Sequence, residues 1–224
     1  MQLLSDVARQ ADTNLSQTTI TEYFQIGGKD DPANLKVVTI AEGGDADKLR
    51  EFFAITKRAD IEKSYVHFYS DLYPGIKASS PVVIEDDENQ NRIQTTEFYS
   101  IGNAWIRSDK DKKYRCEFYP STIAALLKRP VDTDRKSPLG INFPQHQIMH
   151  TEVILPRAWP SEVEKKTIAD SAFTFHKNYR GAGNKIVMEY EYQSLTDSVA
   201  PELVSQHLQR LDQSSQSLGY TLVW

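Results

Sequence analysis

The sequence has only one cysteine, Cys116, among its 224 residues. A single cysteine excludes an internal disulfide and any zinc site built from several cysteines. No apolar run approaches the roughly 20 residues that a membrane-spanning helix needs. The first fifteen residues also lack the apolar centre and small-residue cleavage site of a secretory signal. We therefore expect a globular protein that either stays where it is made or is a piece of a longer exported chain.

The sequence also lacks a long run of either charge. Its 26 Lys and Arg against 31 Asp and Glu leave a formal net charge of -5. Nucleic-acid binding needs a concentrated basic face for phosphate contacts, so this class of function is disfavoured. The densest basic patch, Lys110 to Lys113, is short and is typical of a solvated hairpin turn.

The first half of the chain predicts a hairpin followed by one long helix. Residues 18–26 and 35–40 are rich in β-branched and aromatic residues and flank a turn-forming segment. Asp45 is a candidate N-cap for the helix, which shows apolar residues at helical spacing. Pro74 and Gly75 end it, and we expect a bend near Ala59 and Asp60.

The segment EDDENQNR, Glu85 to Arg92, has the acidic spacing of a calcium-binding EF-hand loop. Asp86, Asp87 and Glu88 are therefore candidate metal ligands. However, the sixth loop position is Asn91 rather than glycine, and both flanks alternate like strands, where an EF-hand requires helices. A hairpin turn explains the segment better, and we predict no metal there.

The second half predicts more strands and a closing helix. Alternating or β-rich segments are residues 114–119, 148–155, 172–179 and 185–192, and a short helix is expected from Ser121 to Pro130. A helix opened by Pro201 carries the stripe Val204, Leu208 and Leu211, and the last five residues favour a strand.

Strands joined by hairpins, with helices set apart, indicate an α+β fold of mainly antiparallel sheet in two similar halves, with one long helix in the first half and a C-terminal helix. The predicted organisation is a lead-in at 1–17, an α+β subdomain at 18–130, a connection at 131–144 and an antiparallel subdomain with its closing helix at 145–224.

The sequence offers one candidate set of residues for thiol catalysis. Cys116, His150 and Asp170 occur in the order of a nucleophile, the base that activates it and the acid that orients the base. Reactive cysteines gain from a helix N-terminus, which lowers the thiol pKa. Cys116 instead lies in the middle of a predicted strand, so catalysis by these residues is the alternative and not the preferred hypothesis.

His146 and His150 are four residues apart but enter a predicted strand, where such positions lie roughly 13 Å apart. They therefore predict no shared metal site. The glycines form no phosphate-binding loop, and we predict no cofactor. A second alternative is a small-ligand or peptide-binding protein whose pocket lies between the long helix and the sheet, lined by Arg50, Tyr65 and Tyr69.

A run of motifs resembles a known bacterial family. The motifs, in order, are LKVVTIAEGGDADKLREFF, SYVHFYSDLYPGIK, VIEDDENQNRIQTTEFYSIGNAW, RCEFYPSTIAALLKRP, RKSPLGINFPQHQIMHTEVILPRAW and KIVMEYEYQSLTDSVAPELVSQHLQRLDQSSQSLGY. From about Thr19 onward the chain resembles the region that follows the transglutaminase-like core in proteins carrying a DUF3857 domain.

The resemblance implies a non-catalytic accessory or interaction module. The family's core carries its cysteine in a Gly-x-Cys motif that opens a helix, and this chain has no counterpart, so no catalytic residue is carried over. The implied partner is a protein or an adjacent transglutaminase-like domain, and peptidoglycan-like ligands are a further expectation. The implied compartment is the periplasm or envelope for a fragment of an exported protein, and the cytoplasm for a stand-alone chain. The sequence does not specify the oligomeric state.

Overall fold

The computed structural model describes residues 16–130 and 136–224. Their main feature is a nine-stranded sheet, in which the strands are ordered β10-β11-β12-β9-β1-β2-β5-β3 and β4 also pairs with β5. The strands are β1 (Gln17–Gln25), β2 (Ala33–Glu42), β3 (Lys77–Ala78), β4 (Val83–Asp87), β5 (Arg92–Ile101), β9 (His146–Ile154), β10 (Val163–Ala169), β11 (Phe173–Ala182) and β12 (Lys185–Ser194).

The sheet is continuous across the predicted connection at 131–144. Its central strand, β1, pairs antiparallel with β2 and parallel with β9, while every other pair in the sheet is antiparallel. The predicted α+β class with mainly antiparallel sheet and a C-terminal helix is thus confirmed. The predicted lead-in before Ser16, and residues 131–135 of the predicted connection, lie outside the described residues.

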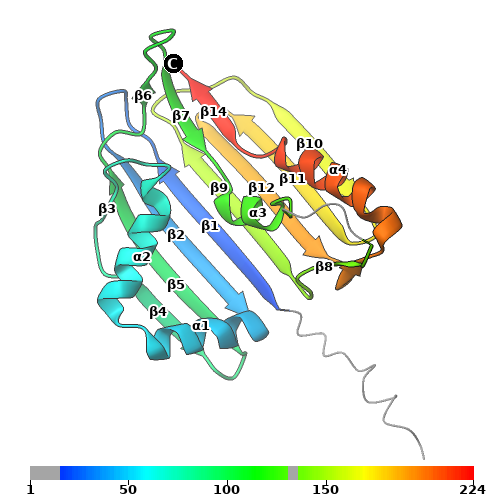
Figure 1. Cartoon of the computed structure of the whole chain (residues 1–224). Coiled ribbons are helices and arrows are strands. Elements are labelled where there is room, and N and C mark those ends of the chain that lie inside the picture. Colours follow the sequence, from blue (N-terminus) through cyan, green and yellow to red (C-terminus); the bar gives the residue numbers. More distant parts are fainter. Residues whose placement is uncertain (1–15, 131–135) are drawn as a thin grey trace, which may run out of the picture.

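The helices of the described residues and the smaller sheets lie on one face of the large sheet (Figure 1). We call this the covered face. Above β2 and β5 lie α1 (Gly44–Ile55) and α2 (Arg58–Ser70), and above the other half lie α3 (Ser121–Leu126) and α4 (Val204–Ser215). A three-stranded sheet contains β6 (Ile106–Arg107), β7 (Tyr114–Phe118) and β14 (Tyr220–Val223), and a two-stranded one contains β8 (Leu139–Gly140) and β13 (Ser198–Val199).

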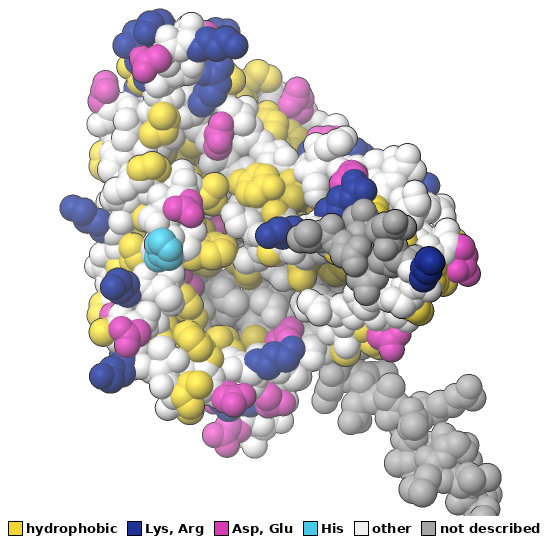
Figure 2. Space-filling view, viewed as in Figure 1, with side chains coloured by type: hydrophobic (Ala, Val, Ile, Leu, Met, Phe, Trp, Pro, Cys, Tyr) yellow, Lys and Arg dark blue, Asp and Glu magenta, His cyan; other side chains and the backbone are white. Residues whose placement is uncertain are grey.

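Residues alternate along each strand between this face and the opposite one, which sets the position of the core. The main core fills the space above the covered face, and its largest fully buried side chains include Phe24, Trp105, Phe173 and Tyr190. In Figure 2 apolar side chains show between the two groups of helices, and Lys and Arg side chains gather at the tip of the molecule, over the β6–β7 hairpin. The predicted hairpin turn at Lys110 to Lys113 is confirmed, with all four residues exposed.

The predicted single long helix is divided into two, and the break lies at Thr56 and Lys57 rather than near Ala59. Both of these residues have extended backbone, with ψ of 132° and 140°. The division lets each helix bury a different set of side chains. From α1, Ala46 packs with Ala41 and Ile93 in a small separate cluster, whereas Tyr69 from α2 enters the main core.

Helix α1 begins after Gly43, whose φ of 62° suits glycine, so the predicted N-cap Asp45 is instead the second residue of the helix. The Asp45 carboxylate instead accepts a hydrogen bond from Thr18 Oγ1 at 3.1 Å. This bond ties the first turn of the helix to β1.

The C-terminal part follows the predicted order. A 3₁₀ turn, η2 (Pro201–Leu203), leads into α4, which buries Val204, Leu208 and Leu211 as predicted. Strand β14 is the predicted final strand and pairs with β7. The sequence interpretation missed β10, because its run of charged residues, Glu164 to Lys166, hides the strand pattern.

The three tryptophans meet at the end of the molecule where β14 ends. The Trp105 ring centroid lies 5.0 Å from that of Trp224 and 6.1 Å from that of Trp159. The Lys29 and Arg157 cations lie 5.0 and 4.3 Å from the Trp224 ring centroid. These contacts hold β14, the last strand of the chain, against the core.

Candidate functional site

The face of the large sheet opposite the helices is covered by no helix or strand of residues 16–130 and 136–224. We call it the open face. Its centre is uncharged and half-buried, and its edges are charged. The uncharged centre contains Thr19, Thr21, Val38, Ile40, Thr96 and Ile148, which are neighbours across β9, β1, β2 and β5.

One row of this face places four side chains of different chemistry next to one another. The strand registers pair Glu152 with Tyr23, Tyr23 with Lys36, and Lys36 with Phe98. Tyr23 and Phe98 are 42% and 38% exposed, which is high for large apolar side chains of interior strands. The Lys36 Nζ atom lies 5.6 Å from the Tyr23 ring centroid and 5.9 Å from that of Phe98.

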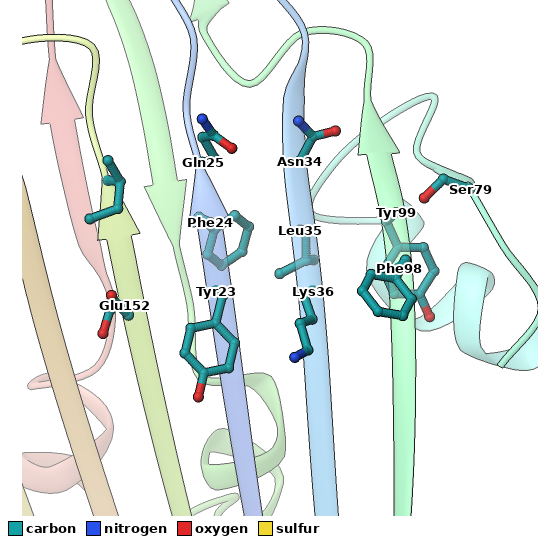
Figure 3. A pocket seen from close by; sticks show the side chains of 11 residues that line it. Tyr23, Phe24, Gln25, Asn34, Leu35, Lys36, Ser79, Phe98, Tyr99 and Glu152 are labelled. Atoms are coloured by element: carbon teal, nitrogen blue, oxygen red, sulfur yellow. The ribbon is translucent and has the colours of Figure 1, made fainter. Parts of the chain in front are cut away.

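A hollow of about 540 Å³ opens over this row (Figure 3). The next row of side chains contributes Gln25 and Asn34, which are direct cross-strand neighbours, together with Ile154. Ser79 lines the hollow from the loop after β3. Alternation directs the side chains of Phe24, Leu35 and Tyr99 to the covered face, so they border the hollow through their main chain.

Two carboxyl groups are buried on the covered face beneath α2. Glu22 on β1 and Glu97 on β5 are 4% and 8% exposed. Tyr69 Oη and Thr151 Oγ1 donate hydrogen bonds to Glu22, each at 3.0 Å, and Tyr99 Oη donates one to Glu97. Burial raises the pKa of each carboxyl to about 7, although these hydrogen bonds oppose the rise.

The structure has almost no free space where Arg50, Tyr65 and Tyr69 were predicted to line a ligand pocket between the helix and the sheet. Tyr69 is buried against Glu22, and burial raises the pKa of Tyr65, beside Glu97, to about 12. The cavity beside Tyr65 and Glu97 measures only about 10 Å³, the room of one water molecule. Arg50, the third predicted residue, is engaged elsewhere.

Arg50 binds the acidic hairpin that raised the question of a calcium site. Its guanidinium donates hydrogen bonds to both carboxylate oxygens of Asp86, with distances of 2.7, 2.8 and 3.0 Å, and one to Asn91 Oδ1 at 2.8 Å. The hydrogen bonds from Arg50 lower the pKa of Asp86.

The segment EDDENQNR forms the predicted hairpin between β4 and β5. Asp87 Oδ1 accepts hydrogen bonds from the amides of Asn89 and Gln90, each at 3.1 Å, and Asn91 has a φ of 45°. Glu88 lies exposed in the turn. The described part of the chain has no group of three or more His, Cys, Asp or Glu able to hold a metal ion.

The structure does not bring Cys116, His150 and Asp170 together. Cys116 on β7 is fully buried in the core, and burial raises the pKa of its thiol to about 12. His150 lies on the open face, with Nδ1 3.3 Å from Glu189 Oε1. Asp170 accepts a hydrogen bond from His207, with 2.7 Å between His207 Nδ1 and Asp170 Oδ2. It accepts a second from the Ala172 amide, with 2.7 Å between that nitrogen and Asp170 Oδ1. Among the described residues no hydrogen bond links Cys116 to a histidine.

His146 and His150 both lie on the open face of β9, and each contacts its own carboxylate on β12. His146 Nε2 is 2.8 Å from Glu191 Oε1, and His150 contacts Glu189. These are separate pairs, consistent with the spacing expected of a strand.

Sequence reasoning missed the hollow and the buried carboxyls. Both glutamates occupy strand positions whose side chains face the core. Glu22 lies between the buried residues Ile20 and Phe24 of β1, and Glu97 lies between the buried residues Thr95 and Tyr99 of β5. A charged residue in the buried phase of a strand was the available signal. Tyr23, Lys36 and Phe98 come from three strands, and only the register between them reveals the hollow.

Comparisons with protein-family models, with curated proteins and with solved structures returned no match for this chain. None of the helices in the described ranges is long and apolar enough to cross a membrane.

Proposed function

We propose that this chain is a non-catalytic accessory module, beside a transglutaminase-like core in a bacterial envelope protein, that binds a protein partner through the open face. The main support for the proposal is that no described helix or strand covers the open face. A nine-stranded sheet with every described helix on one side leaves a broad, rigid surface for a partner.

The layout of the open face supports a protein partner. Protein interfaces combine a centre poor in charge with a polar, charged rim. The uncharged centre around Thr21 and Val38 is bordered along β2 by Lys36 at one end and Glu42 at the other, and across the sheet by Glu189 on β12. The sheet is hydrogen-bonded throughout this region, so its main chain is already satisfied and side chains make the contacts.

A thiol hydrolase or acyltransferase using Cys116, His150 and Asp170 is the alternative function. Proton transfer requires the base within hydrogen-bond reach of the nucleophile, and a buried thiol with a raised pKa is a poor nucleophile. If the purified chain hydrolysed amides or esters and lost that activity on Cys116→Ala, the alternative would replace the proposal.

The test of the proposal is titration of this chain with the transglutaminase-like domain encoded in the same or an adjoining reading frame. We expect binding that weakens at least about tenfold on Thr21→Arg, because a charge placed in the uncharged centre must be desolvated on association. Gln216→Arg adds the same charge at an exposed position at the end of α4 and is the matched control.

Two outcomes contradict the proposal. One is that neither the same reading frame nor an adjoining one encodes such a domain, which removes the partner. The other is a complex that Thr21→Arg and Gln216→Arg affect equally, which places the partner away from the open face.

A further inference from the structure

The hollow lies beside the uncharged centre of the open face and shares no residue with that centre, although Lys36 stands at the border of both. Its volume of about 540 Å³ falls within the usual range for ligand sites in proteins. The groups that line it are aromatic faces, side-chain amides, a hydroxyl, the aliphatic side chain of Ile154, one ammonium and the carboxylate of Glu152 (Figure 3).

The charge of the hollow favours an anionic ligand. Glu152 is neutralised by Lys185, whose Nζ lies 2.8 Å from Glu152 Oε2. Lys36, in contrast, has no carboxylate within 4 Å among the described residues. Its ammonium is held between the Tyr23 and Phe98 rings. A cationic ligand would meet this charge, while a carboxylate would complement it.

The aromatic and amide groups favour a sugar ring. The C–H face of a pyranose is flat and weakly positive, and it stacks on the negative face of an exposed aromatic ring such as Tyr23 or Phe98. Side-chain amides both donate and accept hydrogen bonds, as sugar hydroxyls do. Gln25 and Asn34 are neighbours and exposed, so they can bind adjacent hydroxyls.

Other ligand classes fit less well. An extended peptide binds a sheet chiefly by adding a strand at a free edge, whereas β1 and β2 are paired on both sides. A nucleic acid needs several cations along its phosphates, and the hollow offers only Lys36 without a partner. A purely apolar ligand would bury that ammonium without compensation.

We infer that the hollow binds an acidic glycan. The ligand's carboxylate contacts Lys36, a sugar ring stacks on Tyr23 or Phe98, and hydroxyls bond Gln25 and Asn34. The inference goes beyond the proposed function, because it requires no protein partner and no residue of the uncharged centre. The two common sources of the carboxylate are a uronic acid and the lactyl ether of muramic acid, and the probes separate them.

The test is calorimetric titration of the purified chain with trigalacturonate, with its neutral methyl ester, and with the disaccharide of N-acetylglucosamine and N-acetylmuramic acid. We expect one of the two acidic probes to bind. If the natural ligand carries a uronic acid, trigalacturonate should bind about tenfold more tightly than its methyl ester. For the muramic source, the matching neutral probe is the methyl ester of that disaccharide.

The variants assign the contacts. Lys36→Met should remove the preference for acid over ester, and Tyr23→Ala or Phe98→Ala should weaken both by tenfold or more. Lys165→Met, which removes an exposed ammonium at the far end of the open face, should change nothing. Equal melting temperatures of the variants exclude misfolding as the cause.

The inference is overturned if neither acid binds at millimolar concentration, if acid and ester bind equally, or if Lys36→Met leaves the preference intact. Thr19→Arg separates this result from the proposed function, because it places a charge in the uncharged centre four residues from Tyr23, roughly 13 Å along β1. It should weaken partner binding at least about tenfold while leaving glycan affinity unchanged, so either claim can fail without the other.

Discussion

Tyr23 and Phe24 are consecutive residues of β1 that have opposite surroundings. Phe24 is 2% exposed, and its ring centroid lies 5.1 Å from that of Phe118 and 5.5 Å from that of Tyr73. Tyr23 is 42% exposed and contacts the hollow. The difference extends over the whole sheet, since the covered face holds the fold together and the open face remains available. A substitution should therefore affect either stability or binding, depending on the face.

The largest effect is expected from the two neighbours on β1. Phe24→Ala should lower the free energy of unfolding by about 3 to 5 kcal/mol, because it leaves a cavity in the core. Tyr23→Ala should lower it by less than about 1 kcal/mol, since the ring is largely in water. Urea denaturation of both variants measures the difference. Equal losses would show that the open face also carries the fold.

The buried carboxyls predict a stability that falls as pH rises. The unfolded carboxyl has a pKa near 4.5 and the folded one about 7. Between these values the unfolded state binds fewer protons than the folded state, so stability decreases through this window and stays low above it. Glu22→Gln should remove the part of this pH-dependent loss of stability that Glu22 causes. It should therefore raise the free energy of unfolding at pH 8 by about 3 kcal/mol.

The measurement is urea denaturation of the wild type, Glu22→Gln and Glu97→Gln from pH 5 to pH 8. Glu51→Gln, which makes the same change at an exposed position of α1 away from the histidines of the open face, is the matched control. A wild-type stability that does not fall between pH 5 and pH 8 would contradict the placement of these carboxyls.

A smaller contrast is expected between two histidines. His207 is buried and donates to Asp170, so His207→Ala should cost about 2 kcal/mol, although Asp170 keeps its bonds to backbone amides. His150→Ala on the open face should change stability by less than about 0.5 kcal/mol. Thermal melts compare the two, and a larger loss for His150→Ala would reverse the comparison.

Cys116 gives a prediction about rate rather than stability. Its thiol is buried and its pKa is raised to about 12, so a thiol reagent should modify it only when the protein opens. Labelling should be at least a hundredfold slower in buffer than in urea. Fast labelling of the native protein would indicate an accessible thiol and would revive the enzymatic alternative.

The elements predicted well from sequence are those with local causes. The β4–β5 hairpin depends on Asp87 and Asn91, and the stripe of α4 depends on residues three and four apart. The pairing of β1 with β9 has no local signal, because it joins segments far apart in the chain. The division between α1 and α2 depends on which side chains the sheet accepts.

The candidate site was less predictable for the same reason. Arg50, Tyr65 and Tyr69 were expected to line one pocket between the long helix and the sheet, but the fold directs Tyr69 inward to Glu22 and Arg50 outward to Asp86. Lys36 and Phe98 become neighbours only when β2 and β5 pair. Chemistry assembled across strands therefore required the register, which no single segment encodes.

Measuring melting temperature and partner affinity together for Thr21→Arg tests the role of the open face most directly. We expect an unchanged melting temperature and an affinity for the transglutaminase-like domain weakened at least about tenfold, with Gln216→Arg unaffected in both. A lower melting temperature with unchanged affinity would contradict this expectation, because the open face would then serve the fold rather than binding.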